Sequence, residues 1–254
     1  MRAFIATAAA AVVLLLPLPI DAQGRGGRGA GPAQPAPSPR AAAPIDLAGY
    51  WVAIVSEDWR WRMGVGLKGD FGYLPLNAEG RRVGNAWDPA QDAAAGDQCK
   101  AYGAAAIMRV PARLHITWEN DATLKIDIDN GTQTRRLNFG GSVPPDFQPT
   151  WQGYSVANWE VRGGCGRQAA PPRSGELKVV TTKMRPGYYF RHGIPYSENA
   201  VLTEYFARLS DQGADYLAVT TLVEDSRYLA QPFIRTLQFR REPDGAKWKP
   251  TPCA

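Results

Sequence analysis

The sequence has few of the residues on which most metal enzymes and nucleophilic enzymes depend. It contains only two histidines and three cysteines, and no pair of cysteines has the C-x-x-C spacing. A zinc knuckle, a thioredoxin-type site or a histidine-rich metal centre is therefore not expected. The G-x-S-x-G motif of hydrolases, the phosphate-binding glycine loop and the dinucleotide fingerprint are also missing. No hydrolase, kinase or dehydrogenase class has positive support, and we expect neither a cofactor nor a metal.

A large charge excess is also missing from the region expected to fold. The chain carries a formal net charge of +5, and four arginines against one aspartate place +3 of it in residues 1–44. The remaining +2 is too small for the basic surface of a nucleic-acid-binding protein, so no nucleic-acid partner is expected. The hydrophobic fraction of 44% and the charged fraction of 21% are those of an ordinary globular domain.

The only long apolar run lies at the extreme N-terminus. Arg2 precedes an apolar stretch from Ala3 to Pro17, and Ala22 offers a small residue before a cleavage point. This layout is typical of a secretory signal peptide over residues 1–22, with an uncleaved anchor as the alternative. The stretch is short for a membrane span. We expect a mature chain without a membrane span, located in the periplasm or secreted.

Residues 23–44 are mostly glycine, proline, alanine and arginine and contain no large apolar side chain. Such a segment buries too little surface to offset the entropy of ordering it. The sequence therefore predicts a disordered tether over 23–44 and a single folded domain over 45–254.

From Ile45 onward, hydrophobic residues recur at every second position rather than at helical spacing. The alternation over 50–63 predicts a strand with Trp59, Trp61 and Met63 on one face. Asn130-Gly131 predicts a tight hairpin, because these residues accept a positive φ. Only 77–87 predicts a helix, with Asn77 as its cap. Other strands are predicted at 114–118, 124–128, 132–139, 153–161, 177–184, 200–209, 216–225 and 233–242.

Consecutive strands with tight turns predict an all-β fold. We expect an antiparallel barrel of about eight to ten strands with one short helix, and a β-sandwich is the alternative. The segments 64–106 and 140–175 are expected to be mostly loops that cover an open end.

The three cysteines predict one disulfide and one free thiol in an oxidising compartment. Cys165 lies in a glycine-rich stretch that holds nothing in place. Cys253 is the penultimate residue, where a bridge would fix a chain end. We therefore expect Cys99 to pair with Cys253 and Cys165 to remain free.

Several short motifs are spread across residues 46–254, and together they resemble a family of uncharacterised exported bacterial proteins. The resemblance implies no activity. It places Cys99 and Cys253 in matching motifs and leaves Cys165 outside them, in agreement with the expected disulfide. The motifs are Asp46–Trp51, Glu57–Arg60, Gln98–Gly103, Met108–Pro111, Thr150–Gly153, Pro195–Ala200 and Pro250–Cys253.

Gly49-Tyr50-Trp51 has the G-x-W pattern and, more weakly, resembles the first strand of lipocalin-like (calycin) barrels. The resemblance implies that Trp51 closes one end of the barrel beneath an arginine from a late strand. Arg235 and Arg240 are the candidates for that arginine.

Aromatic residues on two segments suggest a binding function. We expect an exported protein that holds a small apolar or aromatic ligand in a barrel cavity, with contacts from the residues named below. The same aromatic residues are also compatible with ordinary core packing. The expected contacts are Trp59, Trp61, Tyr188, His192 and Tyr196.

Two other functions stay open. His192 lies close in sequence to Tyr196 and Glu198, which suggests a cofactor-independent lyase, isomerase or hydratase that uses the same cavity. A structural or assembly factor of the cell envelope is the remaining alternative. Charged side chains such as Arg62 and Glu204 are expected to face solvent rather than the barrel interior.

Overall fold

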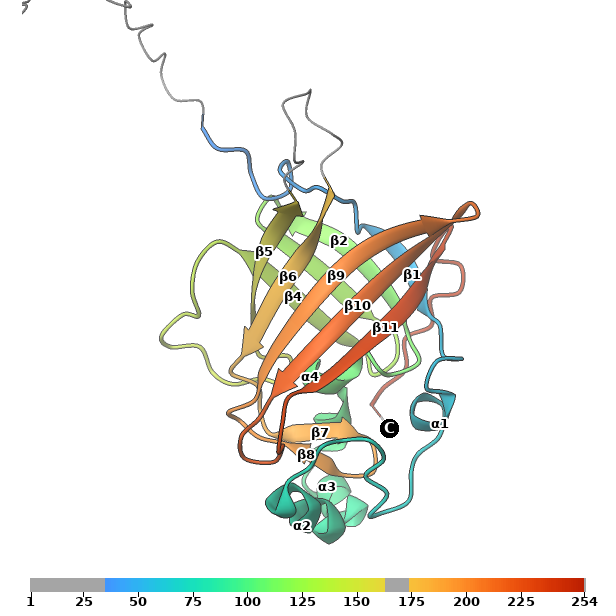
Figure 1. The fold of residues 1–254 in the computed structure, drawn as a ribbon, viewed down its shortest axis with the longest axis vertical. Coiled ribbons are helices and arrows are strands. Elements are labelled where there is room, and N and C mark those ends of the chain that lie inside the picture. Colours follow the sequence, from blue (N-terminus) through green and yellow to red (C-terminus); the bar gives the residue numbers. More distant parts are fainter. Residues whose placement is uncertain (1–34, 163–173, 254) are drawn as a thin grey trace, which may run out of the picture. The chain divides into compact units, whose positions relative to one another are not determined.

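Nine strands close into a barrel in this computed structural model, which describes residues 35–162 and 174–253 (Figure 1). The all-β barrel expected from the alternation is confirmed. The expected signal peptide, most of the expected tether, and Cys165 lie outside the described residues. Going round the barrel, the strands are β1 (Gly49–Ala53), β11 (Phe233–Glu242), β10 (Ala214–Glu224), β9 (Val201–Asp211), β6 (Ser174–Thr182), β5 (Tyr154–Arg162), β4 (Gln133–Phe139), β3 (Thr123–Ile128) and β2 (Arg113–Asn120).

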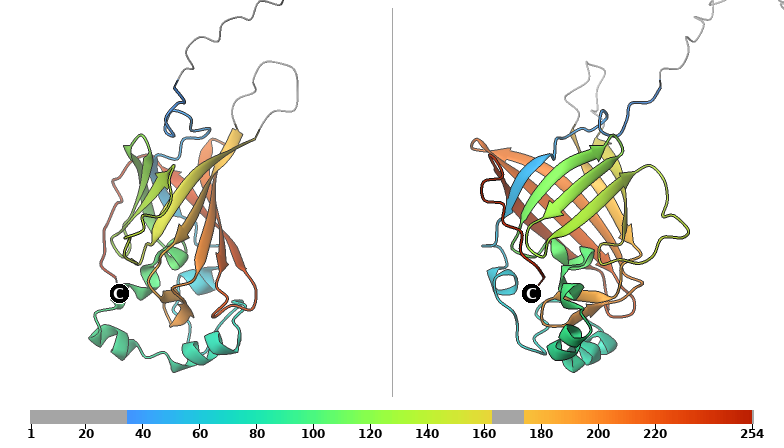
Figure 2. Two further views of the ribbon diagram at one scale, coloured as in Figure 1. Left: turned by 90° about the vertical axis from the view of Figure 1, so that its left-hand side faces the viewer. Right: turned by 180° about the vertical axis from the view of Figure 1, so that it is seen from behind.

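One neighbouring pair of strands departs from the expected antiparallel arrangement. β4 and β5 pair in parallel, with Leu137 opposite Ser155 and Phe139 opposite Ala157. The connection over 140–153 swings outward and returns (Figure 2), so that β5 starts beside the end of β4 and continues in the same direction. The barrel is therefore mixed, and the prediction of a purely antiparallel sheet is wrong at this pair.

The inward-facing positions of the strands fill the barrel mostly with apolar side chains. Because successive residues of a strand point to opposite faces, one side of each strand supplies the core. Tyr102, Ile107 and Met108 add to this core from the segment before β2. The barrel interior is thus packed with side chains, and a ligand there would have to displace them. The fully buried strand residues include Trp51, Leu114, Ile116, Ile126, Leu177, Phe206, Leu217 and Phe239.

Trp51 is fully buried, and its indole Nε1 donates to the carbonyl of Leu47 at 2.9 Å. The guanidinium of Arg241 lies over its ring, 5.5 Å from the centroid. The arginine above this tryptophan is therefore Arg241, not Arg235 or Arg240 as expected. Arg241 is next to Arg240 in sequence, but successive side chains on β11 point to opposite faces.

Short helices and a two-stranded hairpin gather at one end of the barrel (Figure 1). The expected helix is confirmed as α2 (Ala78–Ala86), and Asn77 Oδ1 accepts a bond from the backbone N–H of Gly80 at 2.9 Å. The region expected to be mostly loop also contains further helical turns. These turns are α3 (Pro89–Ala94), the 3-10 helix η1 (Gln98–Tyr102) and α4 (Ala104–Ile107). The hairpin consists of β7 (Gly187–Phe190) and β8 (Ile194–Tyr196).

The strand predicted over 50–63 is wrong in its second half. β1 ends at Ala53, the N–H of Ile54 makes a last bond to Gln238, and the chain then turns into the one-turn helix α1 (Trp59–Arg62). Asp58 before this helix has a φ of 64°, a left-handed conformation that ends strand geometry. Arg62 points inward rather than to solvent.

The disulfide between Cys99 and Cys253 is present, with the two Cα atoms 5.2 Å apart. The C-terminal tail reaches η1 by running beside the β3–β4 turn, where the N–H of Thr251 donates to Asp129 at 2.9 Å. The expected pairing of these two cysteines is confirmed.

Part of the segment expected to be a tether contacts the barrel. The indole of Trp159 donates to the carbonyl of Pro39 at 2.8 Å, and the N–H of Arg40 donates to Asp121 at 3.1 Å. Within the described ranges, no helix has the length and apolar character needed to cross a membrane.

Candidate functional site

A cavity of about 650 Å³ lies along the edge of β11. It exists because β1 leaves the sheet after Ile54, so that the first half of β11 has β10 on one side and no strand on the other. We call this cavity the mouth pocket. Its lining residues are Glu57, Asp58, Trp61, Tyr73, Ile234, Arg235, Thr236, Leu237 and Gln238.

Tyr73 is the fixed centre of the mouth pocket. Its hydroxyl donates to Asp58 in a short hydrogen bond and accepts from Arg109 at 3.2 Å. Its ring stacks on Phe233, with the centroids 5.9 Å apart. Burial raises the pKa of Tyr73, and the bond to Asp58 raises it further against the lowering effect of Arg109. Tyr73 is therefore a neutral hydrogen-bond donor at neutral pH, held in one orientation.

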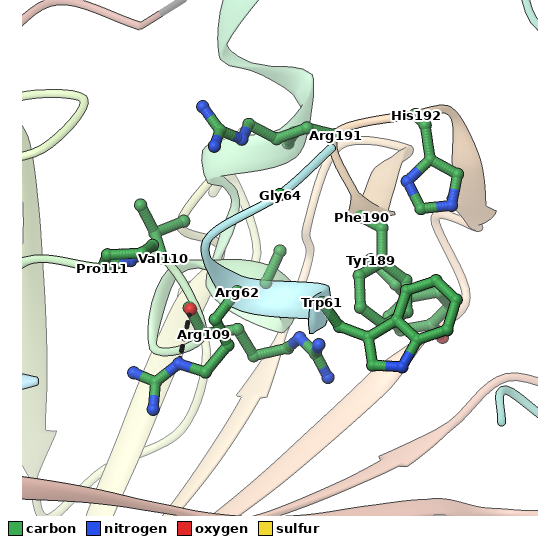
Figure 3. Close-up of a pocket in the computed structure, with 12 residues that line it drawn as sticks. Trp61, Arg62, Gly64, Arg109, Val110, Pro111, Tyr189, Phe190, Arg191 and His192 are labelled. Carbon is green, nitrogen blue, oxygen red and sulfur yellow. Dashed lines mark hydrogen bonds between the residues drawn. The ribbon is translucent and has the colours of Figure 1, made fainter. Parts of the chain in front are cut away.

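Two buried arginines, Arg109 and Arg62, lie near Tyr73 and Asp58. Arg109 is 6% exposed, pairs with Asp58 at 3.5 Å, and lies over the ring of Phe190, 4.0 Å from its centroid. Arg62 donates through Nε to the carbonyl of Arg109 at 3.0 Å (Figure 3) and through Nη1 to that of Ile54 at 2.6 Å. Burial lowers the pKa of both guanidinium groups, and each is also close to another cation. Arg62 and Arg109 thus place positive charge beside Tyr73, and the carboxylates of Glu57 and Asp58 only partly neutralise it.

Arg235 contributes a third guanidinium, which faces the cavity. It lies over the ring of Tyr73, 3.4 Å from the centroid. Its Nε is buried without a hydrogen-bond partner, as is Oε2 of Glu57 in the same lining. The mouth pocket therefore combines aromatic surface with polar atoms that the described protein atoms leave unmatched.

A second, much smaller cavity also has Trp61 in its lining (Figure 3). It is bordered by Tyr189, Phe190 and His192 and holds about 30 Å³, which is room for a water molecule but not for an organic ligand. His192 Nε2 is 2.7 Å from the carbonyl oxygen of Asp70, so this nitrogen carries the proton and donates. Burial lowers the pKa of His192, which favours the neutral imidazole.

The structure divides the five expected ligand contacts among several places. Trp61 lines the mouth pocket. The ring of His192 lies beside the indole of Trp61, with the two ring centroids 6.3 Å apart. Trp59 is 67% exposed and is not part of the mouth-pocket lining. Tyr196 is fully buried in the core beneath the short helices, and Tyr188 lines a different cavity.

The three residues of the catalytic alternative do not meet. Glu198 pairs with Arg227 at 3.0 Å, with both side chains about half exposed. The hydroxyl of Tyr196 is buried without a hydrogen-bond partner, and burial raises its pKa. His192 bonds to a backbone carbonyl. The arrangement needed for acid–base catalysis by these three side chains is therefore not formed.

The cavity beside Tyr188 measures about 210 Å³ and includes Trp87, Lys100 and Arg191 in its lining. Its central carboxylate, Asp92, accepts from Lys100 at 2.6 Å, from the Tyr188 hydroxyl at 2.7 Å and from the Trp87 indole at 3.0 Å. The carboxylate of Asp92 is thus fully engaged by protein donors. This cavity offers fewer unmatched polar groups than the mouth pocket does.

Sequence reasoning missed Tyr73, Arg109 and the pocket role of Arg235. Arg235 lies between Phe233 and Leu237 in the inward register of β11. This position was the sequence signal that Arg235 points inward. The same signal was present for Glu204. This residue is fully buried, although we expected it to face solvent. A charged residue in an apolar register marks a side chain that points inward.

The buried state of His192 gives a pH dependence of stability. Because its pKa is lowered in the folded protein, the unfolded chain binds more protons under mildly acidic conditions, and stability rises with pH. We expect the free energy of unfolding to be constant above the ordinary histidine value of 6.5 and to fall as the pH drops below it. Urea titrations at about pH 7.5 and about pH 5.5 measure this difference.

The matched variants for this titration are His192→Gln and His115→Gln. His115 is the other histidine and stacks on Tyr50, with ring centroids 4.1 Å apart. Replacing His192 should reduce the acid-dependent loss, whereas replacing His115 should leave it. The same loss in both variants would show that His192 is not its source.

No family model, curated protein or solved structure matches this chain.

Proposed function

We propose that this protein binds a small molecule with an aromatic or apolar body in the mouth pocket. The observation that carries the proposal is a cavity of about 650 Å³ whose lining joins the rings of Trp61 and Tyr73 to the unpaired guanidinium of Arg235. Small-molecule sites are concave, enclose some hundreds of cubic ångströms, and combine apolar surface with a few fixed polar groups. The mouth pocket has each of these properties.

The aromatic surface of the pocket is held in place before any ligand arrives. Tyr73 is fixed by its hydroxyl bonds to Asp58 and Arg109 and by its stack on Phe233. The indole of Trp61 meets Tyr73 edge to face, with ring centroids 5.9 Å apart. A site ordered in advance loses little conformational entropy on binding, which favours affinity.

The mouth pocket is a better candidate than the other spaces in the molecule. The barrel interior is filled by its own core, including Trp51 and Phe206. The cavity beside Tyr188 has about a third of the volume of the mouth pocket, and the charges of Lys100 and Asp92 neutralise each other there. Volume and unmatched polar groups both favour the edge of β11.

The proposal places this binding outside the cytoplasm. The disulfide between Cys99 and Cys253 supports that location, because such bonds persist in oxidising compartments. The apolar N-terminal segment expected to direct export supports it from the sequence. The ligand would then be a compound met in the periplasm or outside the cell.

The neutral probe N-phenylnaphthylamine tests the proposal, because its emission rises in apolar sites and it accepts energy from tryptophan. We expect saturable binding to the mature protein. Trp61→Ala should weaken binding by about tenfold through loss of one aromatic wall. Trp59→Ala removes an exposed indole two residues away and should have no effect. Equal affinities for the two variants would contradict the assignment.

A further inference from the structure

Arg235 is the one residue of the mouth-pocket lining that brings a positive charge, and no acidic side chain among the described residues pairs with it. Its contacts are aromatic: the guanidinium carbon lies 3.4 Å from the ring centroid of Tyr73 and 5.7 Å from that of Phe233. Such stacking holds a guanidinium in one plane but does not neutralise it.

The two acidic residues of the lining do not compensate Arg235. Asp58 accepts from Tyr73 and pairs with Arg109. Glu57 raises the pKa of Arg62 through its negative charge, and Glu57 Oε2 has no hydrogen-bond partner. Three guanidinium groups therefore meet two carboxylates in this part of the molecule, and the unmatched positive charge is the one that faces the cavity.

The orientation of Arg235 indicates which of its atoms are available to a ligand. The ring of Tyr73 covers one face of the guanidinium, and Nε is buried. The two Nη atoms are neither buried without a partner nor bonded to the described protein atoms. Their N–H groups lie in one plane, as the two oxygens of a carboxylate require for a bidentate pair.

We infer that the ligand of the mouth pocket is an aromatic or apolar monocarboxylic acid whose carboxylate binds the Nη atoms of Arg235. This inference rests on the proposed function and names the chemical class of its ligand. The body of the acid lies against Trp61 and beside the ring of Tyr73. Glu57 and Asp58 line the same cavity, so a second carboxylate on the ligand is repelled. The site favours monoanions over both neutral molecules and dianions.

Displacement of N-phenylnaphthylamine by a matched pair of competitors tests the inference on the whole mature protein. Naphthylacetate and naphthylacetamide share the same ring system, but the first carries a carboxylate and the second a neutral amide. We expect the acid to displace the probe at a concentration about tenfold lower than the amide, as for a charge-assisted bidentate bond. A naphthalene dicarboxylate should bind more weakly than naphthylacetate.

Three variants separate the role of Arg235 from that of the pocket as a whole. Arg235→Gln should cost naphthylacetate about tenfold more affinity than it costs naphthylacetamide. Arg235→Lys, which keeps the charge but loses the planar fork, should give an intermediate preference for the acid. Arg240→Gln is the control, because Arg240 is exposed on the same strand and is not part of the lining.

Each outcome of this experiment has a separate meaning. If the acid and the amide displace the probe equally from the wild type, or if Arg235→Gln weakens both equally, the carboxylate assignment is overturned while the pocket stands. If the probe fails to bind the wild type, the proposed function fails and the carboxylate assignment fails with it. Probe affinity in Arg235→Gln shows whether the pocket itself remains intact.

Discussion

Arg135→Met is expected to lower the free energy of unfolding by about 3–5 kcal/mol, because it leaves the carboxylate of Glu204 charged and unpaired inside the barrel. Both side chains of this pair are fully buried, and Arg135 Nη1 donates to Glu204 Oε1 at 2.9 Å. Arg135 Nη2 bonds to the other carboxylate oxygen and reaches Thr181 Oγ1 at 3.4 Å. Urea unfolding followed by tryptophan fluorescence measures the loss.

A neighbouring variant and a double variant make this result specific. Arg136→Met removes an exposed pair with Glu119 and should cost less than about 1 kcal/mol. Adding Glu204→Leu to Arg135→Met should recover most of the lost stability, since an apolar pair leaves no buried charge. A cost for Arg135→Met as small as that for Arg136→Met would contradict the burial of the pair.

Cys253→Ser should reduce stability by up to about 5 kcal/mol, the value that the chain-entropy model assigns to a closed loop of this size. The linked cysteines are 154 residues apart in sequence, so the bond restricts much of the unfolded chain. It also ties the C-terminal tail to η1, which supplies Ala101 and Tyr102 to the core. Thermal unfolding with and without reductant should reproduce the effect of the substitution.

The third cysteine is the control for this prediction. Cys165→Ser leaves the bond between Cys99 and Cys253 in place and should hardly change the melting temperature. Cys165 should also be the only cysteine of the native, unreduced protein that reacts with an alkylating reagent. A peptide map that links Cys165 to either partner, or a melting temperature insensitive to reductant, would overturn the assignment.

Those parts of the fold that depend on local chemistry were predictable from the sequence. Period-two alternation indicated the strands, because a half-buried strand needs apolar residues on one face only. Asn77 was recognised as a cap because its short side chain can satisfy a free N–H at the start of a helix. The pairing of Cys99 with Cys253 followed from their number and positions.

The remaining features depend on contacts that no local pattern contains. The alternation over 50–63 continues past Ala53, yet the strand ends where β1 leaves β11. The same departure opens the mouth pocket, so its lining could not be assembled from the sequence. Tyr73 reaches the site from a long connecting segment and Arg235 from β11, and only the folded barrel brings them together.

A crystal structure of the protein with bound N-phenylnaphthylamine would show directly where the ligand binds. We expect the probe to lie in the mouth pocket, against Trp61 and Tyr73 and along the edge of β11, while the packed barrel core around Trp51 and Phe206 is unchanged. A probe bound inside the barrel, with that core displaced, or in the cavity beside Tyr188 would contradict this expectation.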